Sequence, residues 1–491
     1  MKLQNIILSL IALALATSCG TKIPADAVAV DSTVAIWPDY ADVTVPCNIA
    51  PLNFRLAQPQ KAIVEMRSAT AELCVEATAD GSFSIPANRW RHLLAVAQGR
   101  DIAVTIFTRT DNGRWQRHPA FPIHVSADSI DPVLVYRRIA PGYRMWSEMG
   151  IYQRCLESFD EKPILNNKLT NNNCMNCHSF CMQNPGKMMF HQRMMHAGTY
   201  ILADGNIEKL DTKTDSTISA LVYPYWHPSG RFIAFSVNDI KQDFHASADP
   251  NRIEVFDNKS DVVVYDVEHH TVASSPLLKS PDAFETFPSF SPDGKTLYFC
   301  SAKAKSMPDN FQQVRYDLCS ISFDPSTGSF GTLVDTIYAA SQGGHSARFP
   351  RVSPDGRWMM LTESAYGNFS IWHRDADLRL IDLTTGHIDS LSTVNSNDVE
   401  SYHSWSSNSR WFAFSSRRGT GLYTRPYICH IDANGVAAKP FLLPQESAEY
   451  YDRLLTSFNI PELVQGEIDV DTYRLIDISK YGKATKVTPK P

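Results

Sequence analysis

The sequence predicts a mostly β protein of 491 residues, and three observations support that prediction. Short runs that alternate apolar and polar residues follow one another between Ala35 and Tyr136, which is typical of antiparallel strands. Four similar lines recur after Gly198, each with an aromatic-rich strand, a tight turn and a second apolar strand. Between these regions lies a C-x-x-C-H string at residues 174–178. We therefore expect a small β domain, a short cysteine-containing segment and a larger repeated β domain.

The composition excludes several classes of protein. The chain has 46 Lys and Arg against 52 Asp and Glu, and its net charge of −6 is not the basic balance of a nucleic-acid-binding protein. Hydrophobic residues make up 43% of the chain, so it is not disordered. Ten cysteines are too few for a fold held together by disulfides, although they still allow a few bridges or one cofactor site.

Residues 1–18 have the layout of a secretory signal peptide, with Lys2, an apolar stretch ending at Ala16 and small residues before Cys19. The apolar stretch is too short to span a bilayer, and no later stretch reaches 18 consecutive apolar residues. The string A-T-S-C resembles a bacterial lipobox, with Ala16 where that family prefers Leu. The resemblance implies lipidation of Cys19 and an outer-membrane lipoprotein of the cell envelope, facing the periplasm or the surface. Ordinary secretion with a free Cys19 is the alternative.

Residues 19–34 are small and polar and predict a tether. Residues 35–138 predict an all-β sandwich, because short strands at close spacing are separated by turns such as Asp80-Gly81. We expect strands at residues 42–46, 62–66, 71–77, 81–85, 93–97, 102–109 and 123–125.

Residues 139–197 predict a short helical segment that carries the cysteine string. Apolar residues recur at three- to four-residue spacing between Met149 and Phe159. This spacing predicts an amphipathic helix over residues 146–161 that ends before Pro163.

Residues 198–491 contain the repeat. Its lines are YPYWHPSGRFIAFSVN, TFPSFSPDGKTLYFCSA, RFPRVSPDGRWMMLTES and SYHSWSSNSRWFAFSSRR. In the S-P-D-G turns, Pro supplies the fixed φ of the second position, while Asp and Gly suit the third and fourth. A second strand pair follows each line. Four strands per repeat of about 50 to 65 residues are typical of propeller blades.

These lines resemble the TolB-type β-propeller, whose blade motif is an aromatic residue, S-P-D-G, a basic residue and an apolar strand. The resemblance covers residues 198–490 and is strongest at Ser291–Lys295 and Ser353–Arg357. It implies a propeller of five or six blades. Asp293 and Asp355 are interpreted as structural, because the turn recurs from blade to blade.

Closure of the ring is expected from strands at residues 200–202, 207–210 and 473–477. The propeller loops are expected to bind a protein or glycan partner.

The string from Cys174 to His178, C-M-N-C-H, has the form that attaches c-type haem. Cys174 and Cys177 would each add to one haem vinyl group, and His178 would ligate the iron from the proximal side. The predicted export agrees with this interpretation, because bacterial c-type haem is attached outside the cytoplasm. The sequence therefore predicts one covalently bound haem c.

A second axial ligand is expected from the residues that follow the motif: Met182, Met188, Met189, His191, Met194, Met195 and His196. His191 is the first choice for this distal position, so the predicted iron ligands are His178 and His191. His191 and His196 are five residues apart, and only one of them is expected to reach the iron. The segment is shorter than a free-standing cytochrome c domain, so a neighbouring β domain would have to cover the haem.

Other interpretations of the cysteines stay open. Cys174, Cys177, His178 and Cys181 would supply a Cys₃His zinc site, although zinc ligands usually come from two separated pairs. An iron–sulfur cluster is less compatible with an oxidising compartment, and a disulfide beside a free histidine is the remaining alternative. The whole layout also resembles bacterial lipoproteins with a single haem motif between a small β domain and a TolB-like propeller, a resemblance that implies no substrate.

The sequence lacks the common enzyme motifs, including G-x-S-x-G, H-E-x-x-H and G-x-x-x-x-G-K-[ST]. A glycosidase carboxylate pair is neither nominated nor excluded by 52 acidic residues. The sequence therefore predicts a lipoprotein that is not an enzyme and that acts in electron transfer or haem-linked binding. The alternative is a binding propeller without haem, in which the cysteine segment is a structural clasp.

Overall fold

The computed structural model describes residues 21–140, 148–244 and 253–490 and forms two compact units. The first unit ends at Ala127 and takes in the later segment Pro444–Tyr451, whereas Thr44–Ile49 and residues 128–138 belong to the second unit. The first unit is therefore shorter than the predicted 35–138 domain. The predicted signal peptide and Cys19 lie outside the described residues.

The first unit contains a seven-stranded sheet, a three-stranded sheet and one long helix. The seven strands are β1 (Val28–Ala29), β3 (Val43–Val45), β5 (Ala62–Ser68), β6 (Ala71–Glu76), β8 (Arg100–Arg109), β9 (Trp115–Arg117) and β10 (Phe121–Val125). The three-stranded sheet contains β2 (Ile36–Trp37), β4 (Phe54–Leu56) and β7 (Ser82–Phe83). Strand β1 pairs with β9, so part of the predicted tether belongs to a sheet. The predicted sandwich arrangement stays a prediction.

Helix α2 (Ala87–Ala97) replaces the strand expected at residues 93–97. Its buried residues Trp90, Leu93, Leu94 and Ala97 have the i, i+3, i+4, i+7 spacing of one helical face. The helix packs on β5, β6 and β8. The short apolar run by itself cannot be told from a strand, and the helical spacing becomes visible only when the upstream Trp90 is included.

Six sheets make up the second unit among the residues that the structure describes. Sheet 1 contains β34 (Ser457–Val464), β11 (Val133–Ile139), β12 (Met149–Cys155) and β13 (Glu161–Asn166). Sheet 2 contains β14 (Met175–Phe180), β15 (Lys187–Gln192), β16 (Gly198–Ala203), β17 (Asn206–Asp211) and β35 (Thr485–Lys486). Sheet 3 contains β18 (Val222–Trp226), β19 (Phe232–Phe244), β20 (Ile253–Asp266), β21 (Thr271–Ala273) and β36 (Thr488–Pro489).

The other three sheets have four strands each. Sheet 4 contains β22 (Ala283–Phe290), β23 (Thr296–Lys303), β24 (Asp317–Asp324) and β25 (Ser329–Tyr338). Sheet 5 contains β26 (Ser346–Val352), β27 (Trp358–Ser364), β28 (Asp377–Asp382) and β29 (Ile388–Asp389). Sheet 6 contains β30 (Glu400–Trp405), β31 (Trp411–Ser416), β32 (Arg425–His430) and β33 (Phe441–Leu442).

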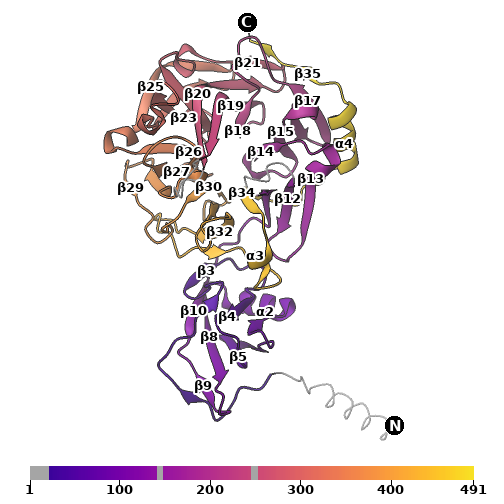
Figure 1. Cartoon of the computed structure of the whole chain (residues 1–491), viewed down its shortest axis with the longest axis vertical. Coiled ribbons are helices and arrows are strands. Elements are labelled where there is room, and N and C mark those ends of the chain that lie inside the picture. The colour runs from indigo at the N-terminus through magenta and orange to yellow at the C-terminus, as the bar shows by residue number, and fades with distance from the viewer. Residues whose placement is uncertain (1–20, 141–147, 245–252, 491) are drawn as a thin grey trace. The chain divides into compact units, whose positions relative to one another are not determined.

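The second unit is a β-propeller. The first-named strands of the six sheets contact one another in sequence, from β14 through β18, β22, β26 and β30 to β34, and β34 contacts β14 again. Figure 1 shows the sheets following one another around this ring, with the colour advancing from magenta to orange. Sheet 1 joins the ring because β34, from the end of the chain, pairs antiparallel with β11. We call these six strands the inner strands.

Two predicted elements of the second unit also differ from the structure. The helix expected at residues 146–161 is replaced by the strands β12 and β13, so the segment at 139–197 is β structure with short 3₁₀ turns. The spacing is misleading because β12 is buried on both faces, which removes the alternation of a strand. The strand expected at 473–477 is instead part of helix α4 (Thr472–Tyr481), which begins at the N-cap Asp471.

The remaining helical segments are short. They are η2 (Asn167–Thr170), η3 (Cys181–Gln183), η4 (Met194–His196), η5 (Pro276–Leu278), η6 (Phe311–Gln313), η7 (Ala340–Gly343), η8 (Ser370–Trp372) and α3 (Tyr450–Arg453). No helix of the described residues is long and apolar enough to cross a membrane.

The predicted S-P-D-G turns join the first two strands of their sheets. In sheet 4 the Ser291 hydroxyl donates to Asp293 Oδ1 at 2.5 Å, and the same oxygen accepts the backbone N–H of Lys295 at 3.0 Å. Asp355 makes the equivalent contacts in sheet 5. These hydrogen bonds close the turn locally, which supports the structural interpretation of both aspartates.

Candidate functional site

Every inner strand has the same two-residue bulge. The first bulge residue has a positive φ between 49° and 55° in all six strands, and the pairing register shifts around it. The six pairs are Cys177-His178, Tyr223-Pro224, Phe287-Pro288, Phe349-Pro350, Tyr402-His403 and Ile460-Pro461. The cysteine motif is therefore part of the propeller repeat, at a place where residues other than glycine are strained.

A cavity of about 1060 Å³ lies within the ring of inner strands. All six positive-φ residues line it, including the aromatic rings of Tyr223, Phe287, Phe349 and Tyr402. Adjacent rings of this set are in contact, with centroids 4.1 to 5.1 Å apart. The wall also holds Arg137, Arg193, Arg351, Arg374 and Arg417, with the carboxylates of Asp398 and Glu462. The cavity thus combines an aromatic belt with an excess of cationic side chains.

The predicted haem-binding residues Cys174, Cys177 and His178 all line this cavity. Both cysteines are free thiols, and all three side chains are 5% exposed or less. Burial raises the pKa of the Cys177 thiol, while a hydrogen bond to the Tyr223 backbone and the charges of Arg193 and Arg137 lower it. The thiol is therefore protonated at neutral pH.

His178 is a neutral imidazole at neutral pH. Burial lowers its pKa to about 3, the Arg137 guanidinium lowers it further, and backbone groups of Ile460 and Val135 act in the opposite direction. Neither ring nitrogen completes a hydrogen bond with those backbone groups. A neutral imidazole with two unsatisfied nitrogens is chemically able to ligate a metal.

His403 occupies the same bulge position as His178, in sheet 6. Its Nε2 forms a 3.0 Å hydrogen bond with the Met360 carbonyl of the preceding sheet. Burial also lowers the pKa of His403 to about 3. A buried histidine at this position therefore has a structural use that needs no cofactor.

The structure does not bring His191 into the central cavity with His178. His191 lies on β15, the second strand of sheet 2, where its Nδ1 is 3.1 Å from the Thr199 hydroxyl. It lines a second cavity of about 550 Å³ instead. Among the seven predicted axial candidates, Met182 is the one that lines the central cavity. The second strand of a sheet is one step removed from the ring interior, which explains the misplaced expectation.

The zinc interpretation is not supported by side-chain placement. Within the described part of the chain, one group of at least three potential ligands comes close enough to share an ion: Asp266, Glu268 and His269. Asp266 is already bound there by Arg231 at 3.0 Å. The motif cysteines, with Cys181, do not form such a group.

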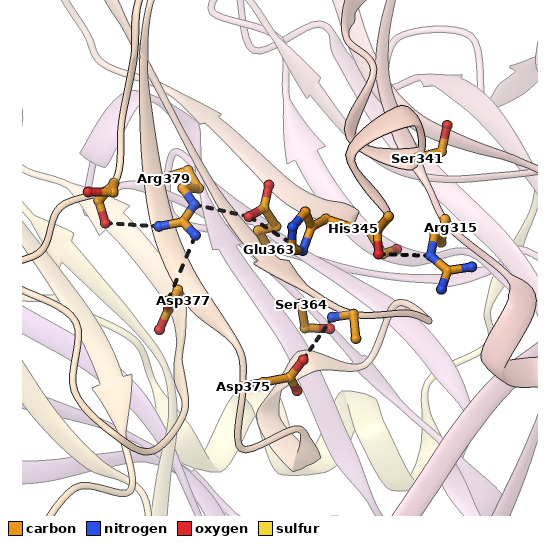
Figure 2. Close-up of polar contacts among 12 residues, drawn as sticks. Arg315, Ser341, His345, Glu363, Ser364, Asp375, Asp377 and Arg379 are labelled. Carbon is orange, nitrogen blue, oxygen red and sulfur yellow. Dashed lines mark hydrogen bonds and ion pairs between the residues drawn. The ribbon is translucent and has the colours of Figure 1, made fainter.

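A separate network of charges lies on sheet 5 (Figure 2). Arg379 donates from Nε to Glu363 Oε1 at 3.0 Å and from Nη1 to the Ser390 carbonyl at 3.0 Å, and it approaches Asp377 at 3.9 Å. His345 Nδ1 is 3.9 Å from Glu363 on the other side. One guanidinium thus lies within ion-pair distance of both carboxylates and joins neighbouring strands. This arrangement is structural and does not resemble an acid–base pair facing a cleft.

No protein-family model matches the chain, and no curated protein matches it. A solved prolyl endopeptidase is 12% identical over 65% of this chain, with a TM-score of 0.32, and the chain spans half of that protein's length. The propeller domain of the Trilobed protease from Pyrococcus furiosus is 9% identical, covering 69% of this chain and 81% of the domain, with a TM-score of 0.33. The periplasmic gluconolactonase of Pseudomonas aeruginosa is 11% identical, covering 66% and 99%, with a TM-score of 0.34.

The repeat extends further towards the N-terminus than its S-P-D-G lines indicate. The string C-H-S-F at residues 177–180 matches Y-H-S-W at residues 402–405, and a turn follows each. This signal is visible in the sequence. It is easily missed because the turn after C-H-S-F lacks the S-P-D-G letters.

Proposed function

We propose that this protein is an exported β-propeller that carries one covalent c-type haem in its central cavity and acts in electron transfer or haem-linked binding at the cell envelope. The observation that carries the proposal is that Cys174, Cys177 and His178 line one cavity of about 1060 Å³. Ligand cavities of several hundred to about a thousand Å³ are typical for small molecules and cofactors.

The cavity wall suits a flat, mostly apolar group with acidic substituents. Its aromatic belt would contact the face or edge of a planar macrocycle. Arg137 lies near Cys177, and a guanidinium group is suited to a carboxylate such as a haem propionate. The unsatisfied ring nitrogens of His178 supply the proximal ligand in this proposal. A bound haem would supply one-electron redox chemistry.

The distal ligand is revised from His191 to Met182 in this proposal. Met182 lines the central cavity and is 36% exposed, whereas His191 is buried against Thr199 in the other cavity. Methionine and histidine are both ordinary axial ligands, and methionine raises the reduction potential.

The surroundings of the haem follow from the rest of the chain. We propose that Cys19 carries the lipid anchor to the outer membrane, that the propeller has six blades of the TolB-like kind, and that its loops bind a protein or glycan partner. The six sheets and the pairing of β34 with β11 support the blade count. The lipid anchor rests on the lipobox-like string alone.

A binding propeller without haem is the second candidate function. It is favoured by His403, because a histidine at the same bulge position binds a neighbouring backbone carbonyl without any cofactor. In that case Cys174 and Cys177 form a structural clasp in the wall, and the aromatic belt binds another ligand.

Expression of the full chain in a host with an active cytochrome c maturation system decides between the two candidates. The haem proposal predicts an intact mass increased by one haem, which acid–acetone extraction does not remove, and a sharp absorption band on reduction. Cys174→Ala and Cys177→Ala should each leave haem held by one thioether bond or none. Cys181→Ala is the matched control, because this buried cysteine lies outside the cavity lining.

The axial ligands are tested in the same preparations. His178→Ala should change the spectrum of the bound haem, whereas His403→Ala, at the equivalent bulge, should not. Met182→Ala should convert a low-spin spectrum to a high-spin one, and His191→Ala should leave it unchanged. Protein that carries no haem in that host would reject the proposal and leave the haem-free propeller.

A further inference from the structure

The second cavity contains an unusual set of charges for a partly enclosed space. Its wall holds Arg193, Lys209 and Lys213 against one carboxylate, Asp211. Arg193 and Tyr223 also line the central cavity, so the two cavities share part of their wall. The volume of about 550 Å³ is in the range of small-molecule sites.

None of the three cations is neutralised within the described residues. Lys209 Nζ donates to the Ser479 carbonyl at 2.9 Å, and Lys213 Nζ donates to the Thr217 and Ile218 carbonyls at 2.7 and 2.6 Å. The Arg193 guanidinium makes no hydrogen bond or ion pair with a described residue, although it is half-buried. The Asp211 side chain contacts the backbone of Lys213: its Oδ1 accepts the Lys213 backbone N–H at 3.3 Å.

The unused N–H donors of these cations therefore indicate that the second cavity binds an anion. An ammonium group has three N–H donors and a guanidinium has five, so the carbonyl contacts leave donors on both lysines and all five on Arg193. Arg193 also contributes to the low pKa of His191, which burial lowers to about 3, so the histidine adds no charge of its own. A half-buried guanidinium without a partner is costly unless an anion or water satisfies it.

We propose that the second cavity is a binding site for a small organic molecule with a phosphate or carboxylate group. Arg193 binds the anionic group, and Lys209 and Lys213 supply further charge. The apolar part of the wall, which includes Val222, Ile240 and Met194, contacts the rest of the ligand. The site does not depend on haem in the central cavity.

Calorimetric titration of the mature full-length protein tests the proposal with three probes: phenyl phosphate, benzoate and the uncharged benzyl alcohol. The first two separate the phosphate source from the carboxylate source, and benzyl alcohol should not bind. Arg193→Gln should weaken binding of the charged probe about tenfold or more, since hydrogen bonds to charged groups contribute on that scale. Raising the salt concentration should also weaken binding of the anionic probe, because salt screens its attraction to the cationic side chains.

Arg114→Gln is the matched control, because it removes the same charge from an exposed position in the first unit. Lys213→Gln removes a charge at an exposed side chain and should weaken binding less than Arg193→Gln does. It keeps the proposal testable if Arg193→Gln fails to fold. Absence of binding by both anionic probes at millimolar concentration would overturn the proposal. Equal affinity in native, Arg193→Gln and Lys213→Gln proteins would also overturn it. Titration of protein from hosts with and without haem maturation keeps this outcome separate from the haem proposal.

Discussion

Sheet 2 and sheet 6 share an inner-strand plan but differ in chemistry. Both strands place a histidine second in the bulge, His178 in β14 and His403 in β30. His403 forms a hydrogen bond with the Met360 carbonyl, whereas the nitrogens of His178 complete none. The first residue of the bulge, which precedes the histidine, is Tyr402 in sheet 6 and Cys177 in sheet 2. The comparison teaches that the repeat explains where His178 lies, but not why its nitrogens are unsatisfied beside a thiol.

The largest expected effect is the loss of stability when a core side chain is truncated, and it shows whether the cores of sheets 2 and 6 are packed equally well. Phe412 and Met188 follow the turn at the same register, opposite Trp405 and Phe180, and both are fully buried. Phe412→Ala should reduce the free energy of unfolding by about 4 kcal/mol and Met188→Ala by about 3 kcal/mol. Urea unfolding measures both. A loss below about 1 kcal/mol for Met188→Ala alone would mean that sheet 2 is loosely packed around the motif.

The next effect extends the comparison to sheet 1, where Glu462 directly follows the bulge pair, at the position of Ser179 in sheet 2 and Ser404 in sheet 6. Burial raises the pKa of Glu462 to about 7, while the Phe180 N–H and Arg351 act in the opposite direction. The folded carboxyl therefore holds its proton between its ordinary pKa of 4.5 and about 7, so stability falls as the pH rises through this range.

Glu462→Gln should remove that pH dependence. The variant should match the native protein at pH 5 and exceed it at pH 8 by up to about 3 kcal/mol, since one pKa unit corresponds to about 1.4 kcal/mol. Urea unfolding at the two pH values measures this difference, with the exposed Glu446→Gln as a control. A variant that is less stable at pH 8 would assign the ionised Glu462 a stabilising role.

A smaller effect separates the two histidines directly. In haem-free protein, His403→Ala should cost about 1–2 kcal/mol more than His178→Ala, because it leaves the buried Met360 carbonyl without its partner. His403→Gln and His178→Gln, which fill more of the same space, are the volume controls. Equal losses in the unfolding free energy would show that the two histidines stabilise the fold to the same extent, and would favour the haem-free function.

The smallest effect concerns the turns. Gly356 in sheet 5 has φ +79° and open space where a Cβ would lie, so Gly356→Ala should cost about 1 kcal/mol from backbone strain alone. Gly186 follows the inner strand of sheet 2 without a positive φ, and a Cβ there would approach Asn184 Oδ1 at 3.3 Å. Gly186→Ala should therefore change stability by less than about 0.5 kcal/mol. Thermal unfolding compares the two, and a larger loss at Gly186 would contradict the assigned turn geometry.

Much of the repeat was predictable because its signals are local. The turn at Ser353–Arg357 depends on a few neighbouring residues, and the flanking strands are apolar on both sides of it. The strands predicted at residues 200–202 and 207–210 are β16 and β17 of sheet 2. Sheet 1 and the first two strands of sheet 2 were not predicted, because β12 is buried on both faces and because the turn at Asn184 has other letters. The cysteine motif was found from its spacing, but its strand and bulge were not.

The sequence by itself determined the repeated turns, most of the strands and the C-x-x-C-H spacing, because each depends on residues within a few positions of one another. Tertiary structure alone decided that β34 completes sheet 1 beside β11, a pairing of Val133 with Val464 that no local pattern encodes. It also decided that His178 lines the ring interior while His191, thirteen residues later, lines another cavity. The physical reason is that a cavity wall is assembled from strands far apart in the chain, and the bulge in each strand sets which side chain reaches it.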